Sequence, residues 1–188
     1  PMVSPVNVVV PTEATLDFTI TAGGTAVEGI YVTVAGKIQK TDDQGQVSID
    51  LPDGTYYYSV FSGGYPESFM IGGDTYIYGD EGGREGEEDS YDNIFVANAA
   101  VTVSGTSTAN VDLLVIPFKT KDQGVDTSLD FELTADYSGS KTKTLAKLTS
   151  SAIGDIALPL PTHRNTRNDD TLAFSNYQYI ALSGIYTN

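Results

Sequence analysis

The residue types that carry most enzyme chemistry are scarce in this chain, which has one histidine, His163, and no cysteine. A nucleophilic serine needs a positioned base, and His163 lies in a polar Arg- and Asn-rich segment without an obvious partner. Ser138 and Lys141 fit a Ser-x-x-Lys pattern, but the other motifs of that enzyme class are missing, so a hairpin turn is the better interpretation. We expect no enzyme active site.

Acidic residues are abundant, and many of them concentrate in one Gly-rich segment. Calcium takes about six to eight oxygen ligands, which carboxylates on flexible backbone can supply, although the spacing here is not that of an EF-hand. The alternative is a solvated charge run that keeps the segment soluble. The carboxylates of this candidate calcium site are Asp80, Glu81, Glu85, Glu87, Glu88, Asp89 and Asp92.

Tyrosine is the prominent aromatic residue, with twelve copies and no tryptophan in the chain. Tyr65, Tyr76, Tyr78 and Tyr91 flank the acidic segment. Tyrosine is favoured at interfaces because it combines a large apolar ring with a hydroxyl. These four residues are therefore candidates for an adhesive or inter-subunit contact, with local packing as the alternative.

The formal net charge of −15 restricts the choice of partners. Such an acidic surface repels phosphate backbones and anionic lipid heads, so nucleic acid and membrane surfaces are poor partners. Divalent cations and basic partners fit better. No apolar run approaches the length of a membrane span. Pro1 in place of Met is compatible with removal of a signal segment, and equally with a boundary of other origin.

Alternating apolar residues predict a series of short strands. The alternation is clear over residues 16–20, 30–34, 47–51 and 56–61, and Asp-, Pro- and Gly-containing turns such as 52–54 separate these stretches. β-branched and aromatic residues pack well on a pleated surface. Short strands with turns about every 8–12 residues are typical of a sandwich or barrel. The chain is therefore expected to be all-β.

Two stretches carry a resemblance to a known family: LDFTITAGGTAVEGIYVTVAG (16–36) and TDDQGQVSIDLPDGTYYYSVFSGGY (41–65). They resemble the transthyretin-like fold of carboxypeptidase-regulatory and Cna-B type modules, in which a Thr-Asp-x-x-Gly turn and a Leu-Pro-x-Gly-x-Tyr hairpin recur in this order. Residues 101–115 resemble the final hairpin of that fold. The resemblance implies a Greek-key β-sandwich over 12–117. The long acidic loop at 64–93 departs from the family pattern, and it has room for a hairpin of its own at residues 75–78.

Residues 1–11 stand apart as an N-terminal arm. Val6, Val8 and Val10 alternate, and Val9 adds a further apolar residue. Flanking prolines limit how far such a strand can pair. The arm is either the first strand of its own sheet or a donor strand that completes a neighbouring subunit.

Residues 118–188 form a second β-rich unit in which 177–186 reads as a terminal strand. About 70 residues can make a small second sandwich, and they can instead extend the sheets of the first domain. Both arrangements stay open at this point.

The resemblance implies a non-catalytic spacer, stalk or adhesive role, as such modules have in secreted, surface and pilus proteins. We therefore expect an extracellular structural or adhesive subunit that assembles into a filament through edge strands, with itself or other surface proteins as partners. The alternatives are a calcium- or ligand-binding surface module and a virion surface protein.

Overall fold

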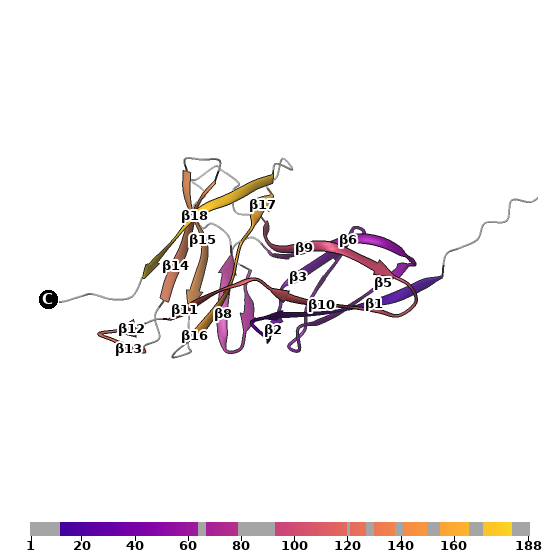
Figure 1. The fold of residues 1–188 in the computed structure, drawn as a ribbon, viewed down its shortest axis with the longest axis horizontal. Helices are drawn as coiled ribbons and strands as arrows, with labels where there is room; N and C mark the ends of the chain where they lie inside the picture. The colour runs from indigo at the N-terminus through magenta and orange to yellow at the C-terminus, as the bar shows by residue number, and fades with distance from the viewer. Residues whose placement is uncertain are drawn as a thin grey trace, which may run out of the picture.

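The computed structural model describes residues 12–63, 67–78, 93–119, 121–126, 130–137, 141–149, 155–165 and 171–181. In these residues every regular element is a strand, and almost all strand pairs are antiparallel (Figure 1). The expected all-β fold with packed sheets, consistent with a β-sandwich, is confirmed.

The N-terminal part of the chain is a sandwich of two layers. Its strands are β1 (Glu13–Ala22), β2 (Thr25–Glu28), β3 (Tyr31–Val34), β4 (Lys37–Lys40), β5 (Gln46–Pro52), β6 (Gly54–Ser62), β9 (Asn93–Val103) and β10 (Ser107–Leu113). In one layer β1 lies between β5 and β10, and in the other the order is β9-β6-β3-β4. The two layers enclose the hydrophobic core.

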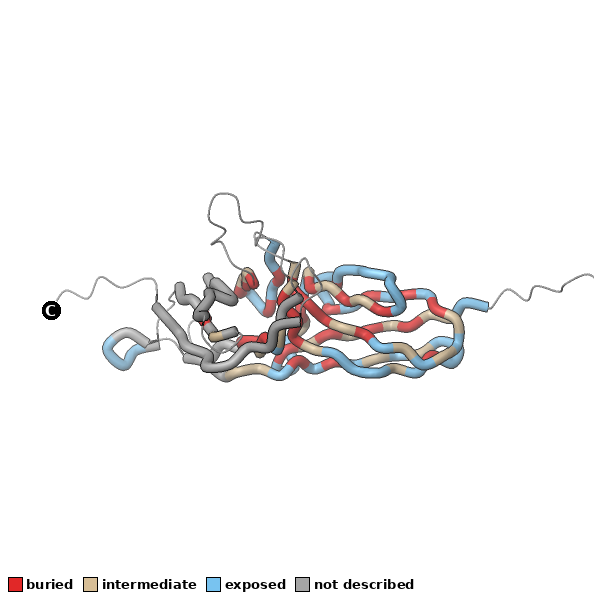
Figure 2. Tube along the Cα trace, turned by 90° about the horizontal axis from the view of Figure 1, so that it is seen from above, coloured by how far each residue is buried: buried red, intermediate tan, exposed pale blue. Residues whose placement is uncertain are grey.

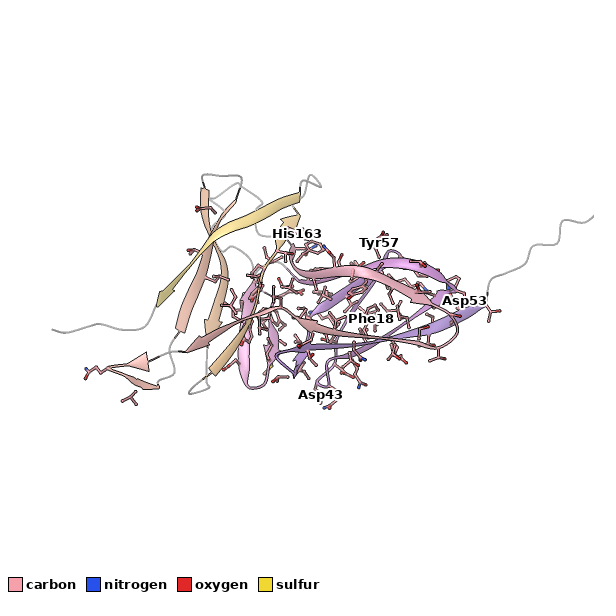
Figure 3. All side chains as sticks on the ribbon, viewed as in Figure 1. Phe18, Asp43, Asp53, Tyr57 and His163 are labelled. Atoms are coloured by element: carbon pink, nitrogen blue, oxygen red, sulfur yellow. The ribbon has the colours of Figure 1, made fainter. Side chains whose placement is uncertain are left out.

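The alternating pattern of the sequence places one face of each strand in this core. Leu16, Phe18 and Ile20 of β1 are fully buried, and the residues between them are only half-buried. The Phe18 ring meets the Tyr58 ring of the opposite layer edge to face, with centroids 5.2 Å apart. Figure 2 shows the same alternation along the strands, and Figure 3 shows Phe18 between the layers.

The Thr-Asp-x-x-Gly turn joins β4 to β5 and is held by its own side chains. Asp42 Oδ1 accepts hydrogen bonds from the backbone amides of Gln44 at 2.9 Å and Gln46 at 2.8 Å. Thr41 is buried, and its hydroxyl donates to the carbonyl of Val27 and accepts from the amide of Ile30. The turn chemistry therefore accounts for Asp42 without a ligand.

The Leu-Pro-x-Gly-x-Tyr segment was expected to close a hairpin, and the structure shows a corner between layers instead. β5 pairs with β1, whereas the following strand β6 pairs with β3 and β9 in the other layer. The Tyr56 hydroxyl donates to the Pro52 carbonyl at 2.8 Å. This bond ties the start of β6 back to the end of β5 and stabilises the change of layer.

The expected final hairpin over residues 101–115 is also wrong. β9 ends at Val103, and β10 crosses to the other layer, where it pairs with β1 in parallel from Leu16↔Ser107 to Ala22↔Leu113. Strand and turn positions were predicted correctly here, but the partner strand was not.

The remaining strands are β7 (Phe69–Ile71), β8 (Asp74–Tyr78), β11 (Val115–Lys119), β12 (Lys121–Asp122), β13 (Val125–Asp126), β14 (Asp130–Tyr137), β15 (Lys141–Thr149), β16 (Asp155–Pro159), β17 (His163–Asn165) and β18 (Thr171–Ala181). Most of them continue the same sheet, whereas β11 pairs with β16 and β12 pairs with β13 in two separate two-stranded sheets. β7 and β8 form the hairpin expected inside the 64–93 segment.

Hydrogen bonds run between the first and second parts of the chain. β15 pairs with β8, and β17 pairs with β9. The pairing path that leaves the sandwich at β2 therefore runs through β7, β8, β15, β14, β18 and β17 and returns to it at β9. The Tyr78 hydroxyl also donates to the Pro159 carbonyl of β16. Figure 1 shows β1 beginning near one end of the long axis and β18 ending near the other. Among the described residues, no helix has the length and hydropathy needed to cross a bilayer.

Candidate functional site

Two of the expected sites lie outside the described residues. These are the donor-strand candidates Val6, Val8, Val9 and Val10 and the calcium candidates Asp80, Glu81, Glu85, Glu87, Glu88, Asp89 and Asp92. Of the tyrosines beside the acidic segment, Tyr65 and Tyr91 also lie outside the described part. In the described ranges, no three His, Asp or Glu side chains gather in a way that could hold a metal ion.

Tyr76 and Tyr78 are core residues of β8. Both side chains are essentially fully buried. The Phe69 ring stacks on Tyr76 at 5.3 Å and meets Tyr78 edge-on at 5.0 Å. Burial, and then the nearby Asp74 charge, raise the pKa of the Tyr76 hydroxyl well above its usual range. In this chain the two rings therefore adopt the local-packing alternative.

The single histidine is engaged in packing on β17. Its ring lies parallel to the Phe95 ring of β9, with centroids 4.6 Å apart and 7° between the planes. His163 Nδ1 lies 2.9 Å from the Thr162 hydroxyl, and Thr162 itself donates to the Phe95 carbonyl. Burial lowers the pKa of His163. The ring is thus used to dock β17 onto the sandwich.

His163 and Phe95 belong to an aromatic row that crosses the outer face of one layer. Phe61 lies 5.2 Å from Phe95, and Tyr31 stacks on Phe61 at 5.3 Å with 13° between the planes. Lys40 lies over the other side of the Tyr31 ring, 4.5 Å from its centroid. These residues are direct cross-strand neighbours on β4, β3, β6, β9 and β17.

The stacking of the rings in this row limits the kind of ligand that the row could bind. Neighbouring rings cover each other's faces, so these rings do not offer the broad flat surfaces on which a sugar ring would stack. The row is instead a line of contacts that joins β17 to the layer of β9, β6 and β3. The proximity of Tyr31, Phe61 and Phe95 depends on which strands pair, so the sequence pattern alone does not reveal them as a group.

A small polar cluster closes the row at its β4 end. Lys40 Nζ lies 3.2 Å from Glu67 Oε2, and both side chains are about equally exposed. Hydrogen bonding with Tyr31, and then with Lys40, lowers the pKa of the Glu67 carboxyl. Because the pair is open to solvent, its contribution to stability is small. The cluster is a surface ion pair rather than a buried reactive centre.

The feature that stands out is an unpaired margin of the sandwich, formed by residues 97–103 of β9 and β10 (107–113), which we call the open margin. β9 pairs with β6 on one edge, and on its other edge β17 covers only residues 93–95. β10 pairs only with β1 among the described strands. Each strand of the open margin therefore has one edge without a partner strand within the described parts of the chain.

Side chains at the open margin leave the core incompletely covered. Ala97 and Val101 of β9 and Ala109 of β10 pack against the core but are only partly buried. Ala99 is opposite the buried Tyr58, on the same face of the layer, and is nevertheless exposed. Cross-strand partners project from the same face of a sheet, so the Ala99 side chain is on the core-facing side of β9. It is exposed because no strand covers this edge within the described residues.

Other exposed edges of the sandwich are shielded. β4 has four residues, all exposed, with lysines at both ends. Lys37 lies 3.4 Å from Glu13 and donates to the Asp50 carbonyl, which places its charge between β4 and β5. Short length and charged residues are features that keep an edge strand from pairing with another chain. The open margin has neither feature over β9.

The signal that could have revealed the open margin is present in the sequence. Residues 93–111 contain no Asp, Glu, Lys or Arg, although charged residues make up 19% of the chain. A long uncharged stretch in an acidic protein indicates a surface that need not stay solvated. That this uncharged stretch lies at an unpaired edge follows only from the tertiary structure, in which β10 pairs with β1 instead of with β9.

No protein-family model matches this chain. No curated protein matches it either. Among solved structures, a DUF3823 family protein from Parabacteroides merdae aligns with a TM-score of 0.35 and 10% sequence identity, over 93% of this chain and 100% of that chain. At this TM-score, nothing about the family or the activity of this chain follows from the likeness.

Proposed function

We propose that this chain is a non-enzymatic structural or adhesive subunit of the extracellular surface, which assembles into a filament or pilus-like polymer through edge-strand contacts. We also propose that the chain is related to transthyretin-like, Cna-B type modules and that it is located at the cell surface. The observation that carries the proposed assembly is the open margin, where β9 and β10 each have one edge without a partner strand among the described residues, at the side where the core is incompletely covered. Such edges add strands from other chains readily.

The packing of the single histidine and of two buried tyrosines supports a structural role. The lone histidine is stacked on Phe95, and Tyr76 and Tyr78 are packed in the core. These groups stabilise strand contacts. Catalysis needs a reactive group held within reach of a substrate, and these three rings are instead held in packing contacts.

The proposal is tested by comparing the full chain with a variant lacking residues 1–11. Sedimentation velocity and negative-stain microscopy should show oligomers or filaments of the full chain and monomers of the truncated one. Deletion of residues 1–4 is the matched control, because it shortens the arm and keeps the valines of its alternating run. A full chain that stays monomeric at all concentrations, or equal assembly of all three proteins, would contradict the proposal.

Calcium binding is the second candidate, favoured by the seven carboxylates between Asp80 and Asp92 with only Arg84 as an opposing charge. Replacing Glu87, Glu88 and Asp89 by alanine should abolish the calcium heat in calorimetry and the calcium-dependent rise in melting temperature. Replacing Glu13 and Glu28 by alanine, in β1 and β2, is the control for lost negative charge. Absence of any calcium heat in the unmodified chain would remove this candidate.

A further inference from the structure

We propose that the open margin is the acceptor for the N-terminal arm of a second copy of this chain, with residues 6–10 adding as a strand against β9. The inference rests on the proposed self-association and specifies both surfaces of the contact. The arm fits the margin in backbone pairing, in side-chain size and in charge.

The backbone requirement is met by β9. Over residues 97–103 one edge of β9 pairs with β6 and the other faces no strand of the described chain. This stretch is longer than the Val6–Val10 run, so all of the run can pair. Pro5 and Pro11, which cannot donate to a ladder, then fall outside the paired region.

The side chains of the two segments are complementary in size. The inward positions Ala97 and Ala99 of β9 and Ala109 of β10 are small and stand at the uncovered side of the core. In an extended arm, Val6, Val8 and Val10 project from one face. These valines would cover the partly buried core positions that the chain's own alanines leave open.

Charge also distinguishes this contact from others on the molecule. Two copies of a chain with formal net charge −15 repel each other, and contact is easiest where neither surface is charged. Residues 1–11 and 93–111 contain no Asp, Glu, Lys or Arg. In contrast, β4 ends in lysines, and β5 carries Asp50 with Lys37 against its backbone.

The geometry of such a contact predicts the form of the assembly. The arm and the open margin are different surfaces, so the contact between two copies is heterologous. A heterologous contact continues from copy to copy and gives a filament unless the rotation happens to close a ring. Each copy would use its arm on one neighbour and offer its margin to another.

Disulfide trapping tests the pairing directly, because the natural chain has no cysteine and hence no background. Val8→Cys protein is mixed with Ala99→Cys protein under mild oxidation. The expected result is a covalent dimer between the two variants. Val8→Cys mixed with Ile38→Cys is the matched control, because Ile38 is an exposed residue of the shielded edge strand β4 and should give none.

Two variants that each add one negative charge, on opposite faces of β9, provide a second, independent test. Ala99→Asp puts a carboxylate at an inward position of the open margin, where a donor strand would bury it, and should weaken self-association at least tenfold. Asn98→Asp adds the same charge at the adjacent exposed position on the opposite face. It should leave self-association within about twofold of the unmodified chain, since surface charges away from a contact have small effects.

The outcomes separate this inference from the proposed function. If removal of residues 1–11 abolishes association while Ala99→Asp does not, and the Val8→Cys and Ala99→Cys proteins form no disulfide-linked dimer, the arm acts elsewhere and the inference fails alone. If the double variant Val8→Cys/Ala99→Cys closes within monomers at every dilution, the arm occupies its own margin and the inference is wrong. Equal trapping by Ile38→Cys also overturns it. If removal of the arm changes nothing, both proposals fail.

Discussion

The backbone of Gly45 lies so close to Ile20 that a Cβ atom on residue 45 would overlap the Ile20 carbonyl oxygen. The same approach allows the Ile20 amide to donate to the Gly45 carbonyl at 2.8 Å. Gly45 has a φ of +72°, which L-residues with a Cβ rarely adopt. The turn before β5 is thereby joined to β1, the central strand of its layer.

Gly45→Ala should therefore be strongly destabilising. The left-handed backbone costs about 1–2 kcal/mol for a non-glycine residue, and relief of the contact with a carbonyl oxygen adds about 1–3 kcal/mol. We expect a loss of about 3 kcal/mol in the free energy of unfolding, measured by urea denaturation. Gly36→Ala is the control, because Gly36 has a φ of +76° but no atom within 4 Å of the added Cβ. Equal losses in the two variants would contradict this account of Gly45.

Thr41→Val should destabilise the fold because it removes the Thr41 hydroxyl while nearly keeping the shape of the side chain. The Thr41 hydroxyl donates to the Val27 carbonyl at 2.6 Å and accepts from the Ile30 amide at 3.2 Å. Valine has a similar shape but leaves both buried backbone groups short of a partner, at a cost of about 1–3 kcal/mol. Thr33→Val, at a half-buried position of β3, should change the free energy of unfolding by about 0.5 kcal/mol or less. Unchanged stability of Thr41→Val would disprove the bridging role.

The stack of His163 on Phe95 should make stability depend on pH. Burial lowers the pKa of His163 below its ordinary value of 6.5, so the folded chain holds this ring neutral where the unfolded chain protonates it. The contribution is fully present above pH 6.5 and is lost as pH falls through the lower folded pKa. The free energy of unfolding of the natural chain should therefore decrease over that window by more than that of His163→Phe.

The two histidine variants separate titration from stacking. His163→Phe keeps a ring against Phe95 and cannot titrate, so carboxylate titrations, common to both proteins, cancel in the comparison. His163→Ala removes the ring and should lose about 1 kcal/mol at neutral pH, in line with other aromatic pairs. An identical decrease with pH in the natural chain and His163→Phe would show that another group is responsible.

Local chemistry in the sequence determined where strands and turns occur. The alternation of Leu16, Phe18 and Ile20 predicts a strand with one buried face, and the structure shows that face in the core. The Thr-Asp-x-x-Gly turn was predicted because Asp caps nearby amides and Gly accepts a positive φ, and both features are present. These signals depend on residues within a few positions of one another.

The tertiary structure alone decided which strands are partners. An alternating strand buries the same face whichever neighbour it has, so its pattern does not specify that neighbour. The family resemblance implied a hairpin over 101–115, and the local pattern could not correct it, whereas in the structure β10 pairs with β1. The aromatic row and the open margin both follow from such long-range pairing, because each joins residues that are distant along the chain. The sequence determined the strands of this protein, and non-local pairing decided its exposed edges.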